Sequence, residues 1–315
     1  MNKLNNKTVL ITGGTGFIGS YLTKVLARKG YNVVVLNKFL TKKENFPAKV
    51  KFYKVDICSK KVDEIFNREH PKIVYHLAAY LPKSEREELI YNINNIKTNI
   101  LGTLSILEVC RKYRVKKIIF SSSAAVYGNP KIVPTPEDYP ASPISLYGLT
   151  KFAAEKLFEI YYRLYNINYT IFRYSNVYGP GQKPGKQGSL IANFIDKIFQ
   201  NEQPIINGGG QQTRDYIYID DVVNANLLAI KTNKVGIYNV GGGIETSINN
   251  IFLKICKIFR KKIKPKYNLS AKIETKRSLL AIKKIKKDLG WEPQNSLEVG
   301  LEKTINYLRN NLKFQ

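Results

Sequence analysis

A glycine-rich turn lies near the start of the sequence, between a strand pattern and a helix pattern. Residues 8–12 are β-branched and apolar, and an apolar pattern with helical spacing runs through residues 22–26. Between them, Gly13 permits a tight turn, Gly16 lets the backbone approach a pyrophosphate, and Gly19 lets the helix pack on the strand. Phosphate then lies on the free N–H groups of the helix N-terminus. The pattern predicts a dinucleotide-binding unit of strand, turn and helix.

Strand patterns and helix patterns alternate along the chain after this unit. This alternation is typical of a parallel, doubly wound sheet, so we predict an α/β, Rossmann-like fold. Ligands bind at the carboxyl ends of the strands in such a sheet. Asp56, the pair Ala78 and Ala79, and the serines at 121–123 fall at these ends. Further strands are expected at residues 31–36, 50–55, 72–77 and 117–120.

The second half of the chain has the features of a smaller substrate-binding lobe. Residues 180–187 are rich in Gly and Pro and predict a loop, whereas residues 297–312 have helical periodicity. The chain is expected to return to the sheet near residues 237–241. We therefore predict a dinucleotide-binding domain over residues 1–175 and a lobe made mainly of residues 176–315.

A tyrosine and a lysine follow the three serines on a long helix pattern. Tyr147 and Lys151 are four residues apart, so they share one face of the helix. An ammonium group beside a phenol favours the phenolate. Lowering the pKa of a tyrosine from about 10 to about 7 needs about 4 kcal/mol of differential stabilisation. Such a tyrosine takes a proton from an alcohol and returns it, and Ser123 is placed to hold the same oxygen. A Tyr and a Lys at this spacing also occur on ordinary helix surfaces, so the pair alone does not define a site.

The residues after the second strand leave the choice between NAD and NADP open. A unit that binds NAD normally carries an acidic residue here, which binds the ribose hydroxyls. This chain has Asn37 followed by Lys38. Asn binds a ribose without repelling a 2′-phosphate, and Lys38 attracts one.

The chain is strongly basic, with 51 Lys and Arg residues against 24 Asp and Glu residues and a formal net charge of +27. Basic clusters at residues 260–266 and 283–287 suggest a nucleic-acid or other anionic partner. The alternative is a Lys-rich solvated surface. We favour this alternative because aromatic residues are not interleaved with the clusters as in a base-stacking platform.

The cysteine and histidine content argues against a metal site. The three cysteines are scattered and the chain has only two histidines, so we expect reduced thiols and no bound metal. No apolar run approaches about 18 residues, which predicts no membrane span. The polar start at residues 1–7 is unlike a signal peptide, and we expect a cytoplasmic protein.

Motifs over nearly the whole length resemble those of one family. The chain is similar to the extended short-chain dehydrogenases/reductases of the NAD-dependent epimerase/dehydratase family, and its pattern is closest to that of UDP-glucose 4-epimerases. The motifs are found at residues 13–19, 56–57, 76–79, 99–103, 121–128, 147–151, 173–180, 214–222, 239–241 and 289–291.

The resemblance implies how the cofactor is held. Tyr147 would be the acid/base, Lys151 would hold the nicotinamide ribose and lower the pKa of Tyr147, and Ser123 would bind the reacting hydroxyl. The cofactor would be NAD, with NADP not excluded. The resemblance places along it Gly13, Gly16, Phe17, Ile18, Gly19, Asn37, Asp56, Ile57, Leu77, Ala78, Ala79, Asn99, Ser121, Tyr147, Lys151 and Tyr174.

The resemblance also implies a nucleotide-sugar substrate and a homodimer. Asn176 would hydrogen-bond the diphosphate, and Arg214 would pair with it through its fork of donors. A structural ion pair between Arg214 and Asp215 is the alternative. The dimer would form through helices at residues 94–113 and 145–165. Substrate contacts are expected at Ser123, Tyr147, Asn176, Leu190 and Arg214.

Two alanines after Ser123 narrow the chemistry that the resemblance implies. At these positions the family's 4,6-dehydratases carry an Asp-Glu pair, and its decarboxylases carry a Glu. This chain has Ala124 and Ala125, so no carboxylate is available there for a second chemical step. What remains is an oxidation and its reversal. We therefore expect a nucleotide-sugar 4-epimerase that transfers hydride to bound NAD through a 4-keto intermediate, with a UDP-hexose favoured.

Three features depart from the family pattern, and two other functions stay open. Residues 80–88 differ from those of UDP-hexose epimerases, residues 271–276 lack the Arg-x-Gly-Asp motif, and the second strand lacks its acid. Lys276 and Arg277 are candidates to replace that motif. An NADP-dependent keto-sugar reductase or reductase-epimerase would consume its cofactor. An RNA-binding protein with a dinucleotide fold would show a salt-dependent gel shift, but it has no need of the Ser-Tyr-Lys set.

Overall fold

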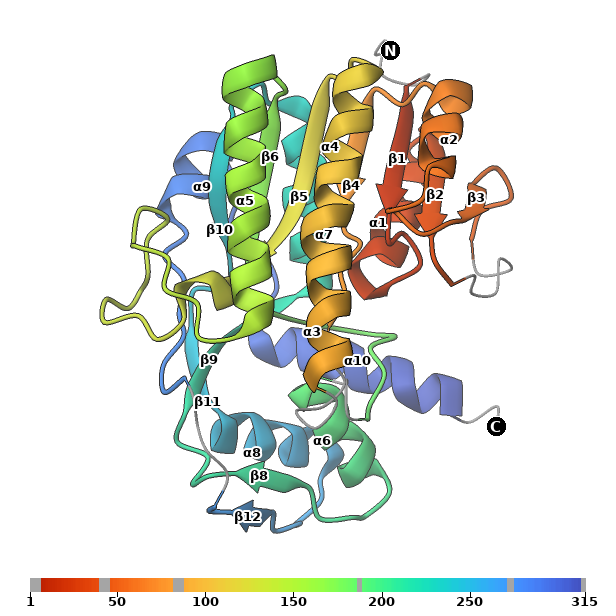
Figure 1. Cartoon of the computed structure of the whole chain (residues 1–315). Helices are drawn as coiled ribbons and strands as arrows, with labels where there is room; N and C mark the ends of the chain where they lie inside the picture. The colour runs from red at the N-terminus through yellow and green to blue at the C-terminus, as the bar shows by residue number, and fades with distance from the viewer. Residues whose placement is uncertain (1–6, 40–45, 82–87, 186–188, 271–274, 313–315) are drawn as a thin grey trace. The chain divides into compact units, whose positions relative to one another are not determined.

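The computed structural model describes residues 7–39, 46–81, 88–185, 189–270 and 275–312 (Figure 1). The chain divides into two compact units, each made of three segments of sequence. The first unit contains Met1–Val126, Ser145–Arg173 and Val223–Tyr238, and the second contains Tyr127–Ile144, Tyr174–Val222 and Asn239–Gln315. No helix in the described ranges is long and apolar enough to cross a membrane. The predicted domain boundary at residue 175 stays a prediction.

A seven-stranded sheet with the order β10-β6-β5-β4-β1-β2-β3 forms the centre of the first unit. Its inner strands pair in parallel, so the predicted α/β, Rossmann-like fold is confirmed. The predicted strands are all present, with ends that differ by a few residues. The strands are β1 (Thr8–Thr12), β2 (Asn32–Asn37), β3 (Lys51–Lys54), β4 (Ile73–His76), β5 (Lys117–Ser123), β6 (Tyr169–Tyr174) and β10 (Gly236–Val240).

The inner strands are apolar on both faces because helices cover both sides of a parallel sheet. In β2 the run from Val33 to Leu36 is buried throughout, and so is all of β4. Helices α4 and α5 lie side by side in front of the sheet in Figure 1. The helices are α1 (Phe17–Arg28), α2 (Lys61–Glu69), α3 (Glu88–Ile96), α4 (Gly102–Lys112), α5 (Leu146–Tyr165) and α7 (Ile219–Lys231), with a π turn η2 (Lys97–Leu101) and a 3-10 turn η3 (Ala124–Tyr127).

The register of the sheet brings three strand ends to one edge. Thr12 of β1 is paired with His76 of β4, and His76 is paired with Phe120 of β5. The residues that follow these positions therefore share that edge, which is where parallel sheets bind their ligands. They are Gly13, Leu77 and Ser121.

In its described residues, the second unit contains two small sheets and four helices. The side chains of Phe194 and Phe252 meet edge to face, with ring centroids 5.9 Å apart, and join α6 to α8. The predicted helix at residues 297–312 is confirmed. The predicted loop at 180–187 is present over its described part, whereas residues 186 and 187 lie outside the described residues. The elements are β7 (Asn176–Tyr178), β9 (Thr213–Tyr218) and β11 (Glu245–Ser247) in one sheet, β8 (Ile205–Asn207) and β12 (Lys266–Asn268) in the other, and α6 (Leu190–Phe199), α8 (Ile248–Phe259), α9 (Lys283–Leu289) and α10 (Leu297–Leu312).

Candidate active site

The turn after β1 requires glycine at two of its positions. Gly13 has a φ of +71°, and a Cβ built on it would lie 2.8 Å from the backbone nitrogen of Ala78. A Cβ on Gly19 would lie 2.2 Å from the carbonyl oxygen of Gly13, so α1 packs directly on the turn. The turn is thus held close both to its own helix and to the segment after β4.

The N-terminus of α1 is open to an anion. Gly16 is the N-cap residue, no side chain caps the helix, and its first turn carries no acidic residue. Apart from its two chain neighbours, a Cβ built on Gly16 would meet a single described atom within 4 Å, the Gly13 carbonyl oxygen at 3.2 Å. The free N–H groups of the first turn and the open side of Gly16 fit the pyrophosphate of a dinucleotide.

Asn37, Lys38 and Asp56 lie together at the ends of β2 and β3. The Asn37 amide donates to the carbonyl of Phe39 at 2.5 Å, which leaves its side-chain oxygen able to accept a bond. Lys38 forms an ion pair with Asp56, with 3.0 Å between Nζ and Oδ2. Although burial opposes it, the pKa of Asp56 is lowered by the backbone N–H of Cys58 and by Lys38. The predicted attraction of Lys38 for a 2′-phosphate is therefore offset by a neighbouring carboxylate.

His76, at the end of β4, is a buried neutral link between β1 and α4. Its Nδ1 lies 2.8 Å from the hydroxyl of Thr12, and its Nε2 lies 2.9 Å from that of Thr103. Because the Thr103 hydroxyl donates to the carbonyl of Asn99, it accepts from Nε2–H, and Nδ1 accepts from Thr12. Burial, and then the charge of Lys151, lowers the pKa of His76 to about 3. His76 therefore positions its neighbours.

Asn99 holds the segment after β4 from inside the protein. Its side-chain oxygen accepts from the backbone N–H of Tyr80 at 2.7 Å, and its amide lies 3.1 Å from the carbonyl of the same residue. The amide also lies within hydrogen-bond distance of Asn95 and Thr150. Asn99 is 2% exposed. A direct contact of Asn99 with the cofactor stays a prediction, and its observed bonds fix the backbone that follows Ala78 and Ala79.

Ser123, Tyr147 and Lys151 come together at the end of β5. The side chain of Ser123 lies beside the hydroxyl of Tyr147 and lowers its pKa, and the Lys151 ammonium lies 5.8 Å from the centroid of the Tyr147 ring. The Lys151 ammonium donates to the carbonyl of Ser121 at 2.7 Å and lies 4.8 Å from the ring centroid of Phe120. Ser145 caps the N-terminus of α5 by accepting from the N–H of Gly148, which fixes where the helix begins. The expected association of the three side chains is therefore present in the structure.

Burial is the main cause of the pKa shifts of Tyr147 and Lys151. It raises the pKa of Tyr147 to about 12, and the side chain of Ser123 opposes this. It lowers the pKa of Lys151 to about 7, and the charge of Glu155 opposes this. The protein groups by themselves thus favour a neutral phenol at Tyr147 and give Lys151 a pKa near 7. The lowering of the Tyr147 pKa by Lys151 stays a prediction for the cofactor-bound protein.

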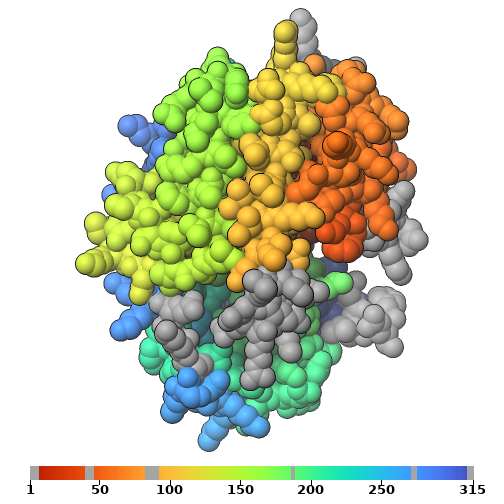
Figure 2. Space-filling model, viewed as in Figure 1, coloured from red at the N-terminus to blue at the C-terminus, as the bar shows by residue number. Residues whose placement is uncertain are grey.

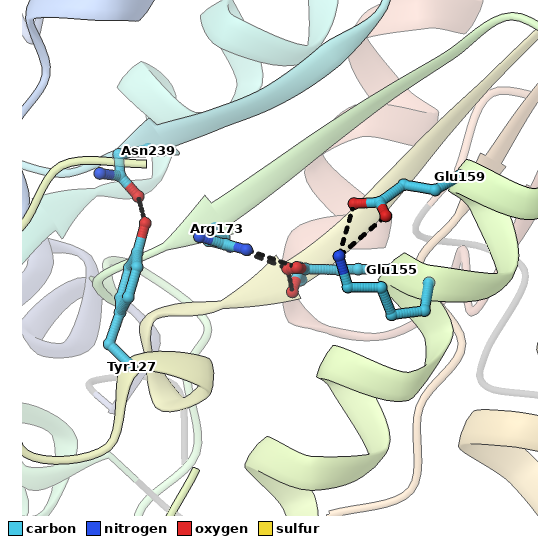
Figure 3. Close-up of polar contacts among 7 residues, drawn as sticks. Tyr127, Glu155, Glu159, Arg173 and Asn239 are labelled. Carbon is cyan, nitrogen blue, oxygen red and sulfur yellow. Dashed lines mark hydrogen bonds and ion pairs between the residues drawn. The ribbon is translucent and has the colours of Figure 1, made fainter. Parts of the chain in front are cut away.

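Glu155 is a buried part of this region that the sequence analysis missed. It lies one turn after Lys151 on α5 and is fully buried, as is most of Arg173 on β6. Two bonds, of 3.0 and 2.6 Å, join the Arg173 guanidinium to the Glu155 carboxylate (Figure 3). Ser122 donates to the same carboxylate at 2.5 Å. The sequence does contain a signal for it, because Glu155 follows Lys151 by four residues, just as Lys151 follows Tyr147.

The predicted diphosphate ligands lie on one small sheet of the second unit. Asn176 of β7 pairs with Tyr216 of β9, and its exposed amide donates to the carbonyl of Asp215 at 3.2 Å. Arg214, also on β9, donates to the carbonyls of Thr213 and Thr275 at 2.8 and 3.0 Å. No carboxylate among the described residues forms an ion pair with Arg214. The Arg214 side chain is half-buried.

Asp215 has its own structural partners, which excludes the alternative of an Arg214–Asp215 pair. Its carboxylate accepts from the N–H groups of Gly242 at 2.7 Å and Leu280 at 3.2 Å. Burial raises the pKa of Asp215 to about 7, against the effect of these donors. Asp215 thus fixes the chain around the strand that carries Arg214.

Other expected residues of the second unit are placed more simply. Leu190 is the first residue of α6, which Ser189 caps, and Tyr174 is the buried last residue of β6. Arg277, a candidate to replace the missing Arg-x-Gly-Asp motif, forms a bidentate pair with Glu245 at 2.9 and 2.6 Å. Lys276 is exposed. Residues 271–274 of that region, and residues 82–87 of the other departure from the family pattern, lie outside the described residues.

A comparison with protein families identifies the chain. The model of the NAD dependent epimerase/dehydratase family matches residues 9–241. The chain belongs to this family. A Methanocaldococcus jannaschii protein named "Putative UDP-glucose 4-epimerase" is 41% identical over 306 residues, which cover 96% of this chain and 99% of that protein.

Solved structures of the same family match over nearly the whole chain. The Thermotoga maritima UDP-glucose 4-epimerase with UDP-glucose has a TM-score of 0.92 and 39% identity, and the match covers 97% of this chain and 99% of that one. The Thermus thermophilus UDP-glucose 4-epimerase in complex with NAD has a TM-score of 0.86 and 32% identity, over 96% and 99%.

Membership of the epimerase/dehydratase family confirms several predictions together. The family resemblance, the doubly wound fold, the NAD-dependent epimerase class and NAD as the cofactor are confirmed. The residues of the glycine-rich turn fit that cofactor, as described above. Ser123, Tyr147 and Lys151 stay the predicted catalytic residues, and their assembly at one edge of the sheet is the geometry on which that prediction depends.

Proposed function

We propose that this chain is a 4-epimerase of a UDP-hexose that works by reversible oxidation at C4 of the sugar. The observation that carries the proposal is the gathering of three side chains at the end of β5: Ser123 lies beside the Tyr147 hydroxyl, and the Lys151 ammonium, one turn further along α5, lies 5.8 Å from the centroid of the Tyr147 ring. The two residues that follow Ser123 are alanines, so no carboxylate there supports elimination or decarboxylation.

The protein residues divide the proton transfer between them. NAD, when bound, accepts the hydride from C4 and returns it. Tyr147, as the phenolate that we predict for the cofactor-bound protein, takes the proton of the 4-hydroxyl as that O–H bond breaks, which leaves a 4-keto sugar and a neutral phenol. Ser123 holds the sugar oxygen throughout. The keto sugar then presents its other face. The hydride returns to C4 and Tyr147 returns the proton to the oxygen, so the cofactor and Tyr147 are both restored to their starting states.

The second unit supplies the groups proposed to bind the diphosphate. Arg214 has no carboxylate partner among the described residues, and its planar fork of donors suits phosphate. Asn176 has an exposed amide on the neighbouring strand. We propose that the two residues together hold the diphosphate of the nucleotide sugar.

We also propose that the enzyme is a cytoplasmic homodimer that associates through the outer faces of α4 and α5. These helices lie side by side on the surface in Figure 2. Their outer faces carry large apolar side chains that are more exposed than is usual for a monomer. These are Leu104, Leu149, Ile160, Leu164 and Tyr165, which are 36 to 65% exposed.

The test is NMR of the purified protein with a panel of UDP-sugars and no added cofactor. Appearance of the C4 epimer of one of them would establish an enzyme that recycles its own tightly bound NAD, and it would name the sugar. An enzyme that instead reduces a keto sugar only when NADPH is supplied would refute the epimerase and support the reductase.

A further inference from the structure

Three consecutive serines of β5 each lie against a different turn of α5. The side chain of Ser123 lies beside the Tyr147 hydroxyl, the carbonyl of Ser121 accepts from Lys151, and the side chain of Ser122 donates to Glu155. The three partners are four residues apart, so they lie above one another on one face of the helix. The pattern joins strand to helix at every turn beside the proposed catalytic residues.

Glu155 is the member of this set with the strongest attachment. Arg173 binds its carboxylate in a fork from the next strand of the sheet, β6, and Ser122 binds it from β5. One carboxylate on α5 therefore fixes the helix to two neighbouring strands. Two turns earlier, the same helix carries Tyr147.

We propose that Glu155 is a positioning residue for Ser123, Tyr147 and Lys151: it fixes the register of α5 on β5 through Ser122 and places a negative charge one turn after Lys151. This inference rests on the proposed function, because these three residues matter only if they perform the proton transfer.

The charges around Lys151 agree with this role. Burial lowers the pKa of Lys151 to about 7, and Glu155 is the group that raises it. The other titratable groups that face this region are Tyr147 on α5, His76 on β4 and Arg173 on β6. Tyr147 and His76 are neutral at pH 7, because the pKa of Tyr147 is about 12 and that of His76 about 3. Arg173 is paired with Glu155. Glu155 is therefore the group whose charge favours the protonated form of Lys151.

The first test is an NMR pH titration of the full chain labelled with ¹³C at the lysine side chains. Lys151 and Lys117 should stand apart from the other lysines, because burial lowers the pKa of Lys117 to about 8. The variant Lys151→Met assigns the Lys151 signal. In Glu155→Gln the midpoint of Lys151 should fall by about one pH unit or more. An unchanged Lys151 midpoint would overturn the proposal.

Two controls separate this effect from general damage. Lys117 lies at the opposite end of β5 and donates to the carbonyl of Thr232, so its midpoint should not move in Glu155→Gln. Glu159, one turn after Glu155, forms an exposed pair with Lys156 at 2.8 Å (Figure 3). The variant Glu159→Gln should leave both midpoints where they are in the unmodified protein.

Glu155→Gln leaves the buried Arg173 without its carboxylate partner, so this variant has the greatest risk of not folding. Ser122→Ala is the second variant, since it keeps the Glu155–Arg173 pair and removes the tie to β5. We expect it to lower kcat about tenfold with KM unchanged, because the loss falls on alignment for proton transfer. An unchanged kcat would overturn the proposal.

The outcomes are distinct from those that test the proposed function. If Tyr147→Phe kept its activity, the proposed function would fail whatever Glu155 does. If Tyr147→Phe were inactive while Glu155→Gln kept both the Lys151 midpoint and the pH profile of kcat, the proposed function would stand and this inference would fail.

Discussion

Lys38 and Asp56 form an ion pair at the ends of two adjacent strands, with 3.0 Å between the ammonium and the carboxylate. The pair is partly exposed, at 59% and 30% of the two side chains, so it contributes at most about 1 kcal/mol to stability. Its larger effect is on charge. The carboxylate offsets the charge of Lys38, the residue directly after β2, which would otherwise attract a 2′-phosphate, and this agrees with NAD as the cofactor.

Asp56→Asn should therefore relax the preference for NAD over NADP. The variant removes a repelling charge and frees Lys38, and we expect NADP affinity to rise about tenfold, which corresponds to about 1.4 kcal/mol. The measurement is a titration of the cofactor-depleted protein with NAD and with NADP. Adding Lys38→Met should cancel the gain. An unchanged NADP affinity in Asp56→Asn would show that Lys38 lies away from the ribose.

Tyr147→Phe should abolish turnover and leave cofactor binding intact. Removing the hydroxyl removes the acid/base, which typically lowers kcat by about 10² to 10⁴-fold. Activity is measured by NMR, and bound NAD by its release on denaturation. Tyr162→Phe, on the same helix but 38% exposed, is the control and should keep full activity. Residual activity close to that of the control would mean that another group transfers the proton.

These residues show what could be read from the sequence and what could not. The strand ends and the Tyr147–Lys151 spacing follow from local patterns, because a helix and a strand each impose their own period on side chains. The pairing of Lys38 with Asp56 depends on β2 and β3 being neighbours, which the sequence does not state. The roles of Glu155 and Ser122 likewise depend on α5 lying across β5 and β6. Asn99 was expected to lie along the cofactor, and its bonds to Tyr80 depend on a loop that no local pattern specifies.

His76 should make stability fall in acid. Its pKa is about 3 in the folded protein and about 6.5 when unfolded, so between these values the unfolded state binds the extra proton. The free energy of unfolding should therefore drop as pH falls from about 6.5 towards 3, by up to about 1.4 kcal/mol per pH unit from this residue. Urea denaturation across this range measures it.

The variant His76→Gln should lose this part of the slope, because Gln does not titrate. His70→Asn is the matched control, since His70 is exposed and its φ of 45° is one that Asn tolerates. Equal slopes for His76→Gln and the unmodified protein would contradict the assignment of a neutral, buried His76.

Tyr127→Phe should destabilise the second unit. The Tyr127 hydroxyl donates to the side-chain oxygen of Asn239 at 2.7 Å (Figure 3). The amide of Asn239 donates in turn to the carbonyls of Thr135 and Ala281. Removing the hydroxyl leaves a buried acceptor unpaired, at a cost of about 1 to 3 kcal/mol.

Thermal and urea unfolding give the measurement for Tyr127→Phe. Tyr267→Phe is the control, because Tyr267 is 49% exposed and its loss of a hydroxyl should change stability by less than about 0.5 kcal/mol. Equal effects of the two variants would mean that water replaces the lost bond at Asn239.

Leu164→Glu should convert a dimer into a monomer. Leu164 is 65% exposed on α5, and a carboxylate there would be buried against the second copy without a partner. Light scattering after size exclusion measures the mass. Leu253→Glu is the control, because Leu253 has a similar exposure, 61%, on α8 of the other unit. A dimer that persists in Leu164→Glu would place the interface elsewhere.

The π turn η2 joins α3 to α4, and its number of residues fixes how the two helices are rotated relative to each other. The N–H of Gly102 bonds to the carbonyl five residues back, at Lys97, so the turn holds one residue more than an α-helical turn. Each helical residue rotates the chain by about 100°. Deleting Ile100 or Leu101 would swing Asn99 out of phase with Ile106, which packs in the core. The segment from α3 to α4 therefore tolerates a substitution in the turn far better than a deletion or an insertion.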